Sequence, residues 1–152
     1  MDVNAINPIL ASFTEVLPLL GFSKVTKKKV SLAGSTLAYD GILLNVAVVG
    51  SIKGVLLLGM SFEDAKKFAS NMMMGMEVLE LDSLAQSAIS ELANMLTANS
   101  ATNLSQMGIE VDISTPILTI GDGFTLKISN DKYICIEMLI NSQTVEINVS
   151  IS

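Results

Sequence analysis

Residues 41–60 restrict the possible folds more than any other part of the chain, because these twenty residues carry one charged side chain, Lys53. A helix of this length and hydropathy could cross a bilayer. Gly50 and Gly54, however, bracket a turn signal in the middle of the run, and both halves are rich in Val, Leu and Ile. The pattern therefore predicts two strands that are buried on both faces, and it argues against membrane insertion.

The length and charge of the chain limit both its organisation and its partners. With 152 residues, we expect a single domain, 1–152, that is long enough to bury a sizeable core. The net charge of −6 leaves no basic surface for a phosphate backbone, which argues against nucleic-acid binding. The chain has no His and no Arg, since all nine cationic residues are lysines. It therefore lacks the usual base of a Ser or Cys hydrolase and the guanidinium that grips phosphate in Cys phosphatases.

Cys135 is the single cysteine, and it stands in the alternating run 133–136. We interpret it as a small buried hydrophobe and not as a reactive thiol. One cysteine cannot form a disulfide within the chain, and the first residues show no cationic start followed by an apolar signal core. We therefore expect the protein in the reducing cytoplasm.

Apolar periodicity, turn residues and caps predict three helices and seven strands. The helices are expected at 5–19, from Ser61 to near Gly75, and from Asp82 or Ser83 to just before Gly108. The strands are expected at 25–32, 37–49, 52–60, 109–120, 124–129, 133–140 and 144–151, with a hairpin turn at 121–123. Runs of adjacent strands indicate an α+β fold in which long helices pack on a largely antiparallel sheet.

Several smaller features indicate structure more than function. Ser61 and Asp64 have the spacing of a helix-capping box. The run 72–74 of three methionines has two interpretations, adaptable core packing, which we favour, and a patch that faces a partner. The lysines at 27–29 are expected at a solvated strand end, and Asp122 is expected in the turn.

A faint internal repeat relates two parts of the chain. Residues 20–22, Leu-Gly-Phe, resemble residues 107–109, Met-Gly-Ile, at an offset of 87. Each triplet follows a predicted helix and precedes a predicted strand. Chance similarity is one explanation, and a fold built from two related halves is the other.

The long third helix carries the residues of greatest chemical interest. Ser87, Glu91 and Asn94 are spaced so that they share one stripe about 60° wide, and Ala98 extends it. The stripe is expected to face outward, with small neighbours that allow another protein to approach closely. The opposite, core-facing side is expected to contain Ala85, Ile89, Leu92, Leu96 and Met107.

By spacing alone, Glu91 and Asn94 could be ordinary solvated positions of an amphipathic helix. The surrounding sequence changes that interpretation. Residues 87–95, followed by Asn99, Met107-Gly108 and Pro116, resemble the motif of the CheC/CheX group of bacterial chemotaxis phosphatases. In that family a Ser or Asp precedes a Glu by four residues, an Asn follows the Glu by three, and a Pro lies about two dozen residues downstream. Ser87, Glu91, Asn94 and Pro116 stand at these positions.

The resemblance implies a fold, an activity and a partner. The fold would be the CheC-like α+β fold, a pseudo-repeat of two halves. The activity would be hydrolysis of the aspartyl phosphate on a CheY-like response regulator. Asn94 would orient the attacking water, and Glu91 would pair with the active-site Lys of the receiver. The receiver would supply Mg²⁺, so no cofactor of the chain's own is expected.

The first helix bears on the number of sites. An offset of 87 places Asn4 opposite Glu91, Asn7 opposite Asn94 and Lys29 opposite Pro116. Because the acid and the proline are missing, we predict one working site per chain, as in the CheX-like branch of the family. A homodimer is also expected by resemblance, with the apolar strand pair within 41–60 offering edges to a second subunit.

Two other interpretations remain at this point. One is a non-catalytic module of the same fold, which binds a receiver or is related to the flagellar switch. The other is an unrelated α+β ligand-binding domain, which would require a deep apolar pocket.

Overall fold

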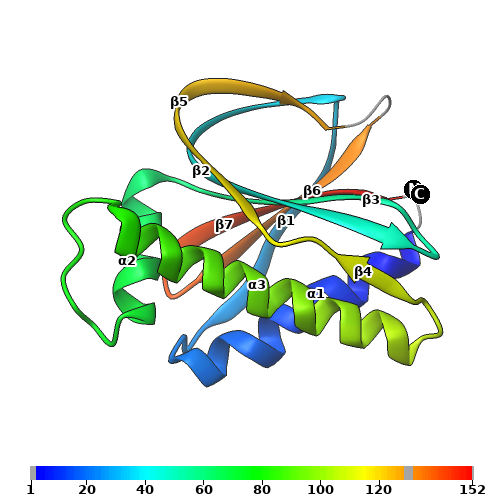
Figure 1. Cartoon of the computed structure of the whole chain (residues 1–152), viewed down its shortest axis with the longest axis horizontal. Coiled ribbons are helices and arrows are strands. Elements are labelled where there is room, and N and C mark those ends of the chain that lie inside the picture. The colour runs from blue at the N-terminus through cyan, green and yellow to red at the C-terminus, as the bar shows by residue number, and fades with distance from the viewer. Residues whose placement is uncertain (1–2, 129–131, 152) are drawn as a thin grey trace.

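The computed structural model describes residues 3–128 and 132–151 (Figure 1). Its helical segments are η1 Val3–Ala5, α1 Ile6–Val16, η2 Leu17–Leu20, α2 Phe62–Met72 and α3 Ser83–Gln106. Its strands are β1 Val25–Ala33, β2 Thr36–Gly50, β3 Gly54–Met60, β4 Val111–Ile113, β5 Ile117–Lys127, β6 Tyr133–Ile140 and β7 Gln143–Ile151.

All seven strands belong to one sheet with the order β1-β6-β7-β3-β2-β4, and β5 also pairs with β2. Every strand pair is antiparallel. The predicted α+β class is therefore confirmed. The run 41–60 forms most of β2 and all of β3, which pair from Ile42 opposite Met60 to Val48 opposite Gly54, as the two-strand prediction required.

The three helices pack on one face of the sheet (Figure 1). The main core lies between them, because alternate residues of the central strands point toward the helices. Ile42, Leu44 and Val46 of β2 belong to this core, and so do Phe13 of α1 and Phe68 of α2. The predicted cap is present as well, since the Ser61 Oγ atom accepts a hydrogen bond from the Asp64 N–H at 3.1 Å.

The opposite face of the sheet carries a smaller core of its own. β2 and β5 curve away from the helices and arch over this face (Figure 1). Leu37, Leu43, Leu57 and Tyr133 are buried beneath the arch. The central strands are therefore apolar on both sides, which explains the near-continuous hydrophobic run 41–60.

The internal repeat is present in the backbone. After α1 the N–H of Gly21 donates to the carbonyl of Pro18 and that of Phe22 to the carbonyl of Leu17. After α3 the N–H of Gly108 donates to Ser105 and that of Ile109 to Leu104, at the offset of 87. Both glycines have positive φ, 93° and 81°, as this type of helix end requires.

The strand order extends the repeat to the sheet. The first half of the chain supplies β1, β2 and β3, and the second half supplies β4 with β5, β6 and β7. In the sheet, β3 and β7 lie together at the centre, β2 and β6 flank them, and β1 and β4 lie outermost. Exchanging each strand of one half with its counterpart in the other half reverses the order but does not change it, so the two halves are related by a pseudo-twofold axis between β3 and β7. The prediction of two related halves is confirmed, and α2 is an addition to the first half.

The predicted hairpin at 121–123 is wrong. β5 continues through these residues and pairs with β2 on both sides of them, with a register shift between Tyr39 and Gly41. The Asp40 carboxylate accepts a hydrogen bond from the Gly123 N–H, so the two glycines allow a bulge and not a reversal. Asp122 is consequently an exposed strand residue. The expected strand end at Ser129 lies outside the described residues.

The single strand predicted at 109–120 is divided into β4 and β5. The break falls at residues 114–116, where the Ser114 N–H donates to the Ala47 carbonyl at 3.0 Å and the Ser114 Oγ atom accepts from the Ala47 N–H at 2.8 Å. The side chain thus takes a position in the ladder that a backbone carbonyl would occupy. Pro116 has no N–H to continue the pairing, which explains the interruption.

The prediction about sheet edges is also wrong. β3 lies between β7 and β2, and β2 lies between β3 and the β4–β5 side, so neither strand of the run 41–60 is an edge. β1 is an outer strand, and Lys27 to Lys29 on it are exposed, which is a common protection against edge pairing. Met107 was expected in the core, but it lies beyond the end of α3 and is 53% exposed.

Candidate active site on the longest helix

α3 is the longest helix, and its ends are fixed by ordinary capping chemistry. The Asp82 carboxylate accepts a hydrogen bond from the Ala85 N–H at 2.9 Å, which begins the helix at Ser83 as predicted. The left-handed Gly108 ends it. Between these points the sequence contains no Pro and no Gly, so the helix runs unbroken for 24 residues.

Polar contacts fasten α3 to α1. The hydroxyls of Ser12 and Ser100 are buried and lie 2.8 Å apart. The Asn103 side-chain amide donates to the Glu15 carboxylate at 2.7 Å and to the Pro8 carbonyl at 3.1 Å. Buried hydroxyls that are paired in this way specify one alignment of the two helices. They fix the rotation of α3 and hence the direction in which its outer face points.

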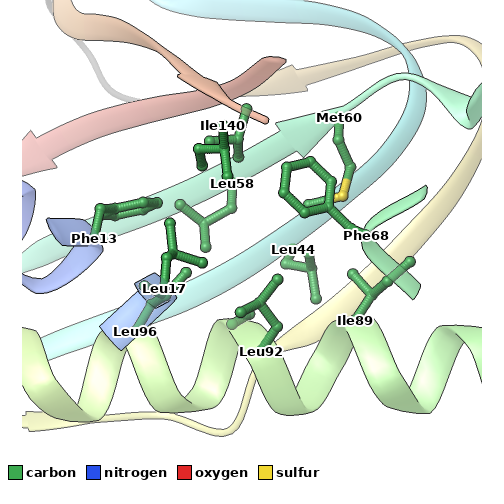
Figure 2. A pocket seen from close by; sticks show the side chains of 12 residues that line it. Phe13, Leu17, Leu44, Leu58, Met60, Phe68, Ile89, Leu92, Leu96 and Ile140 are labelled. Carbon is green, nitrogen blue, oxygen red and sulfur yellow. The ribbon is translucent and has the colours of Figure 1, made fainter. Parts of the chain in front are cut away.

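The inner face of α3 is closely packed. Ile89, Leu92 and Leu96 point toward Leu44 and Leu58 of the sheet (Figure 2). The cavity enclosed by these side chains has a volume of about 10 Å³, which is room for at most one water molecule. This interior therefore offers no ligand-sized pocket, contrary to the ligand-binding interpretation.

The outer face of α3 carries the predicted stripe. Ser87, Glu91, Asn94 and Ala98 are all exposed, and Glu91 is the only charged residue of the helix. Among the described residues, no hydrogen bond or ion pair engages the side chain of Glu91 or of Asn94. A carboxylate and an amide are thus presented to solvent on one line, about 5 Å apart along the helix axis.

Pro116 lies half-buried between β4 and β5, and α3 contacts both of these strands. Ser114, two residues earlier, anchors this connection to β2 through the pair of hydrogen bonds with Ala47. Figure 1 shows the connection passing beside α3. The structure thus brings the segment containing Pro116 to the helix with Glu91 and Asn94.

The repeat counterparts of the site residues lie on the first helix and before it. Asn4 is in η1 and Asn7 is in α1, and both are exposed. They line a shallow groove between α1 and the end of α3, beside Glu15. Glu15 is already held by Asn103, so it does not replace the acid that is missing at position 4.

One exposed feature agrees with the less favoured interpretation of the methionine run and extends beyond it. The loop between α2 and α3 presents Met74 at 98% exposure, Met76 at 59% and Leu79 at 73%. Core packing was the favoured interpretation of the methionine run, and for Met74 it is wrong. Residues 72–74 follow the apolar stripe of α2, and periodicity alone could not show that the helix ends at Met72.

Two features are absent from the described residues. In residues 3–128 and 132–151, no cluster of three or more His, Cys, Asp or Glu side chains could hold a metal ion. Over the same residues, no helix is long and apolar enough to cross a membrane.

The fold and the site define a class of protein, a two-half α+β domain whose longest helix exposes an unpaired carboxylate and amide. Comparison with known proteins agrees with this description. The family model for the chemotaxis phosphatase CheX matches residues 42–139. The CheY-P phosphatase CheX of Thermotoga maritima is 35% identical over 128 residues, which cover 84% of this chain and 82% of the relative. The chain belongs to the CheX family.

Solved structures show the same fold. A CheC-like superfamily protein from a Shewanella species, PV-4, superposes with a TM-score of 0.84 at 26% identity and covers 100% of this chain and 99% of its own. A chain of the CheX-CheY-BeF3-Mg²⁺ complex from Borrelia burgdorferi gives a TM-score of 0.79 at 24% identity, with 96% of each chain covered. The predicted resemblance and the CheC-like fold are confirmed.

Proposed function

We propose that this protein is a phosphatase that removes the phosphoryl group from the aspartyl phosphate of a CheY-like response regulator. The observation that carries the proposal is the exposed pair Glu91 and Asn94, which has no partner among the described residues of a CheX-family chain. The 35% identical relative named CheY-P phosphatase CheX supports the same activity. The reaction is a hydrolysis in two-component signalling.

Asn94 is the residue that would position the nucleophile. Its amide offers both a donor and an acceptor, so it can hold a water in line with the phosphorus–oxygen bond that breaks. An aspartyl phosphate is already an activated acyl phosphate, and the reaction needs little proton transfer from the phosphatase. The chain needs no histidine for this role, which fits a sequence with none.

Glu91 would hold the two proteins in register by pairing with the active-site Lys of the receiver. The receiver would also supply the Mg²⁺ that neutralises the phosphoryl oxygens. The solved CheX-CheY-BeF3-Mg²⁺ complex, which contains a chain of this fold, is consistent with Mg²⁺ from the receiver. Ser87 and Pro116 would support the site from the same stripe and from the adjacent connection.

The test follows the decay of phosphate on a phosphorylated CheY-like receiver from the same organism. Wild type should accelerate the decay, while Asn94→Ala and Glu91→Ala should each reduce the acceleration by roughly a hundredfold without loss of helical circular dichroism. If wild type binds the phosphorylated receiver but leaves its decay unchanged, the protein is a binding module and the proposal fails.

Two further properties belong to this proposal. A response-regulator substrate implies a cytoplasmic location, and the single Cys135 agrees with a reducing compartment. We also expect a homodimer, for which β1 and β5 are the candidate edges, since Leu32 and Ile117 are 62% and 66% exposed there. A monomer mass by light scattering at working concentration would contradict the dimer.

A further inference from the structure

The connection between α2 and α3 exposes several large apolar side chains. Met74, Met76 and Leu79 are joined by Leu84, which is 61% exposed in the first turn of α3. We call these four residues the loop patch. Met76, Leu79 and Leu84 line one open hollow of about 390 Å³. Contiguous exposed apolar residues of this kind mark interaction sites more often than chance placement does.

The loop that carries the patch has a defined conformation. Val78 and Leu81 pack against the main core, while Leu79 between them points outward. The Gln86 side-chain amide donates to the Leu81 carbonyl at 2.7 Å, which ties the loop to α3. The outward side chains are therefore presented from a backbone that the core and α3 hold in place.

The backbone conformation of Met74 also supports an interaction role for the loop patch. Its φ is 61°, a left-handed conformation that is costly for a residue with a side chain. Gly75 follows it with φ 86° and donates its N–H to the Ser70 carbonyl at 2.8 Å, completing the end of α2. A glycine at position 74 would satisfy the backbone more easily. The methionine there directs an almost fully exposed apolar side chain away from the domain.

The patch is continuous with the candidate active site. Leu84, Ser87, Glu91 and Asn94 follow one another at intervals of three, four and three residues, so Leu84 lies on the same stripe of α3. It is about 10 Å from Glu91 along the helix axis. Figure 1 shows the loop projecting beyond this end of α3.

The stripe alone lacks the anchors that a stable contact requires. Apart from Leu84, its exposed side chains are small or polar, whereas interface cores are enriched in methionine and aromatic residues. The loop patch supplies such anchors beside it. Its hollow is rimmed by Glu77, Glu80 and Asp82, and none of the residues that line it is a lysine. An apolar centre with an acidic rim fits a partner surface that is apolar and basic.

We propose that the loop patch is the anchoring part of the docking surface for the phosphorylated receiver, and that it contributes to binding and not to the chemical step. The proposal rests on the proposed function, since the receiver is the occupant of the adjoining stripe. It predicts uniform binding, that is, a contribution to KM without one to kcat.

The experiment compares the full-length chain with Met76→Ser/Leu79→Ser and with Glu77→Lys/Glu80→Lys. Leu19→Ser is the matched control, because Leu19 is 84% exposed but lies in η2, outside the patch. Each protein is titrated against the receiver activated with Mg²⁺ and beryllofluoride, and each is assayed for dephosphorylation. Both double variants should raise Kd and KM at least tenfold with kcat within twofold of wild type, while the control should change neither.

The outcomes separate this proposal from the one on which it rests. Unchanged Kd and KM in both double variants, with Asn94→Ala inactive, would overturn the loop patch and leave the phosphatase proposal standing. A fall in kcat without a change in KM would also overturn it. If wild type binds the activated receiver but does not speed decay, the phosphatase proposal fails, and the Kd values alone then decide the loop patch.

Discussion

Glu91 and Leu92 are adjacent in the sequence, yet replacing them with alanine should change the free energy of unfolding by very different amounts. Leu92 is 3% exposed and packs in the interior shown in Figure 2. Removing its three terminal carbon groups forfeits roughly 2 kcal/mol of transfer free energy at about 0.8 kcal/mol per group. The surrounding cavity holds only about 10 Å³, so the neighbours have little slack to close the new space. A further cost of about 1 kcal/mol is expected for the cavity, giving about 3 kcal/mol in total.

Urea unfolding monitored by circular dichroism measures this difference. With a slope of about 2 kcal/mol per molar urea, Leu92→Ala should lower the midpoint by about 1.5 M. Glu91 is exposed and has no partner among the described residues, so Glu91→Ala should change the free energy of unfolding by less than about 0.5 kcal/mol. Similar midpoints for the two variants would refute the orientation of α3, and with it the outward position of the candidate site.

Three other expectations follow from particular residues. Asn7→Ala should leave dephosphorylation unchanged, because the acid that would accompany Asn7 is absent; a loss equal to that of Asn94→Ala would contradict the single site. Gly41→Ala should lower the free energy of unfolding by about 3 kcal/mol or more, since the φ of Gly41 is 126° and an added Cβ would collide with the Met60 carbonyl. Its urea midpoint should therefore be clearly lower, and a midpoint like that of wild type would disprove the close approach. Burial, followed by the charge of Glu146, raises the pKa of Cys135 from 9.0 to about 12. The thiol form is thus favoured by folding, and its contribution to stability is complete below pH 9 and lost as the pH rises toward 12. Alkylation of Cys135 at pH 8 should therefore be slow in the native chain and fast in urea, and equal rates would show that the thiol is exposed.

Local signals in the sequence were sufficient for much of the fold. Gly21 and Gly108 each follow a helix, and their shared positive φ reflects a backbone requirement that glycine meets best. The repeat could be recognised from them for this reason. The apolar run 41–60 likewise predicted two strands buried on both faces, because Gly50 and Gly54 mark a turn within it and both halves are rich in Val, Leu and Ile.

Features that depend on distant partners could not be obtained in this way. The glycines at 121 and 123 have the composition of a hairpin turn, but they lie in a bulge of β5, where residues 122 and 123 face the single residue Asp40 of β2. Which strand pairs with them is a long-range property. The position of β3 between β2 and β7 is of the same kind, which is why the edge prediction failed.

The same distinction between local and long-range information applies to the candidate site. That Ser87, Glu91 and Asn94 share an outward stripe follows from the helical period, and the structure confirms it. The roles of Glu91 and Asn94 came from the family resemblance and remain predictions. The exposure of Met74 and Met76 was not predicted because it depends on where α2 ends, and the three methionines at 72–74 carry no signal that ends a helix before Gly75.

The composition of α3 explains why such a site would act only in a complex. A helix of 24 residues with one charge, set in a chain without His or Arg, has no group that serves as a strong base or grips a phosphate. Asn94 is neutral at every physiological pH, and Glu91 alone repels a phosphoryl group. Both side chains become useful only beside a cation that another molecule supplies. Under the proposed function, the receiver would bring Mg²⁺ and a lysine, and specificity would then arise from docking, not from the two side chains at the site.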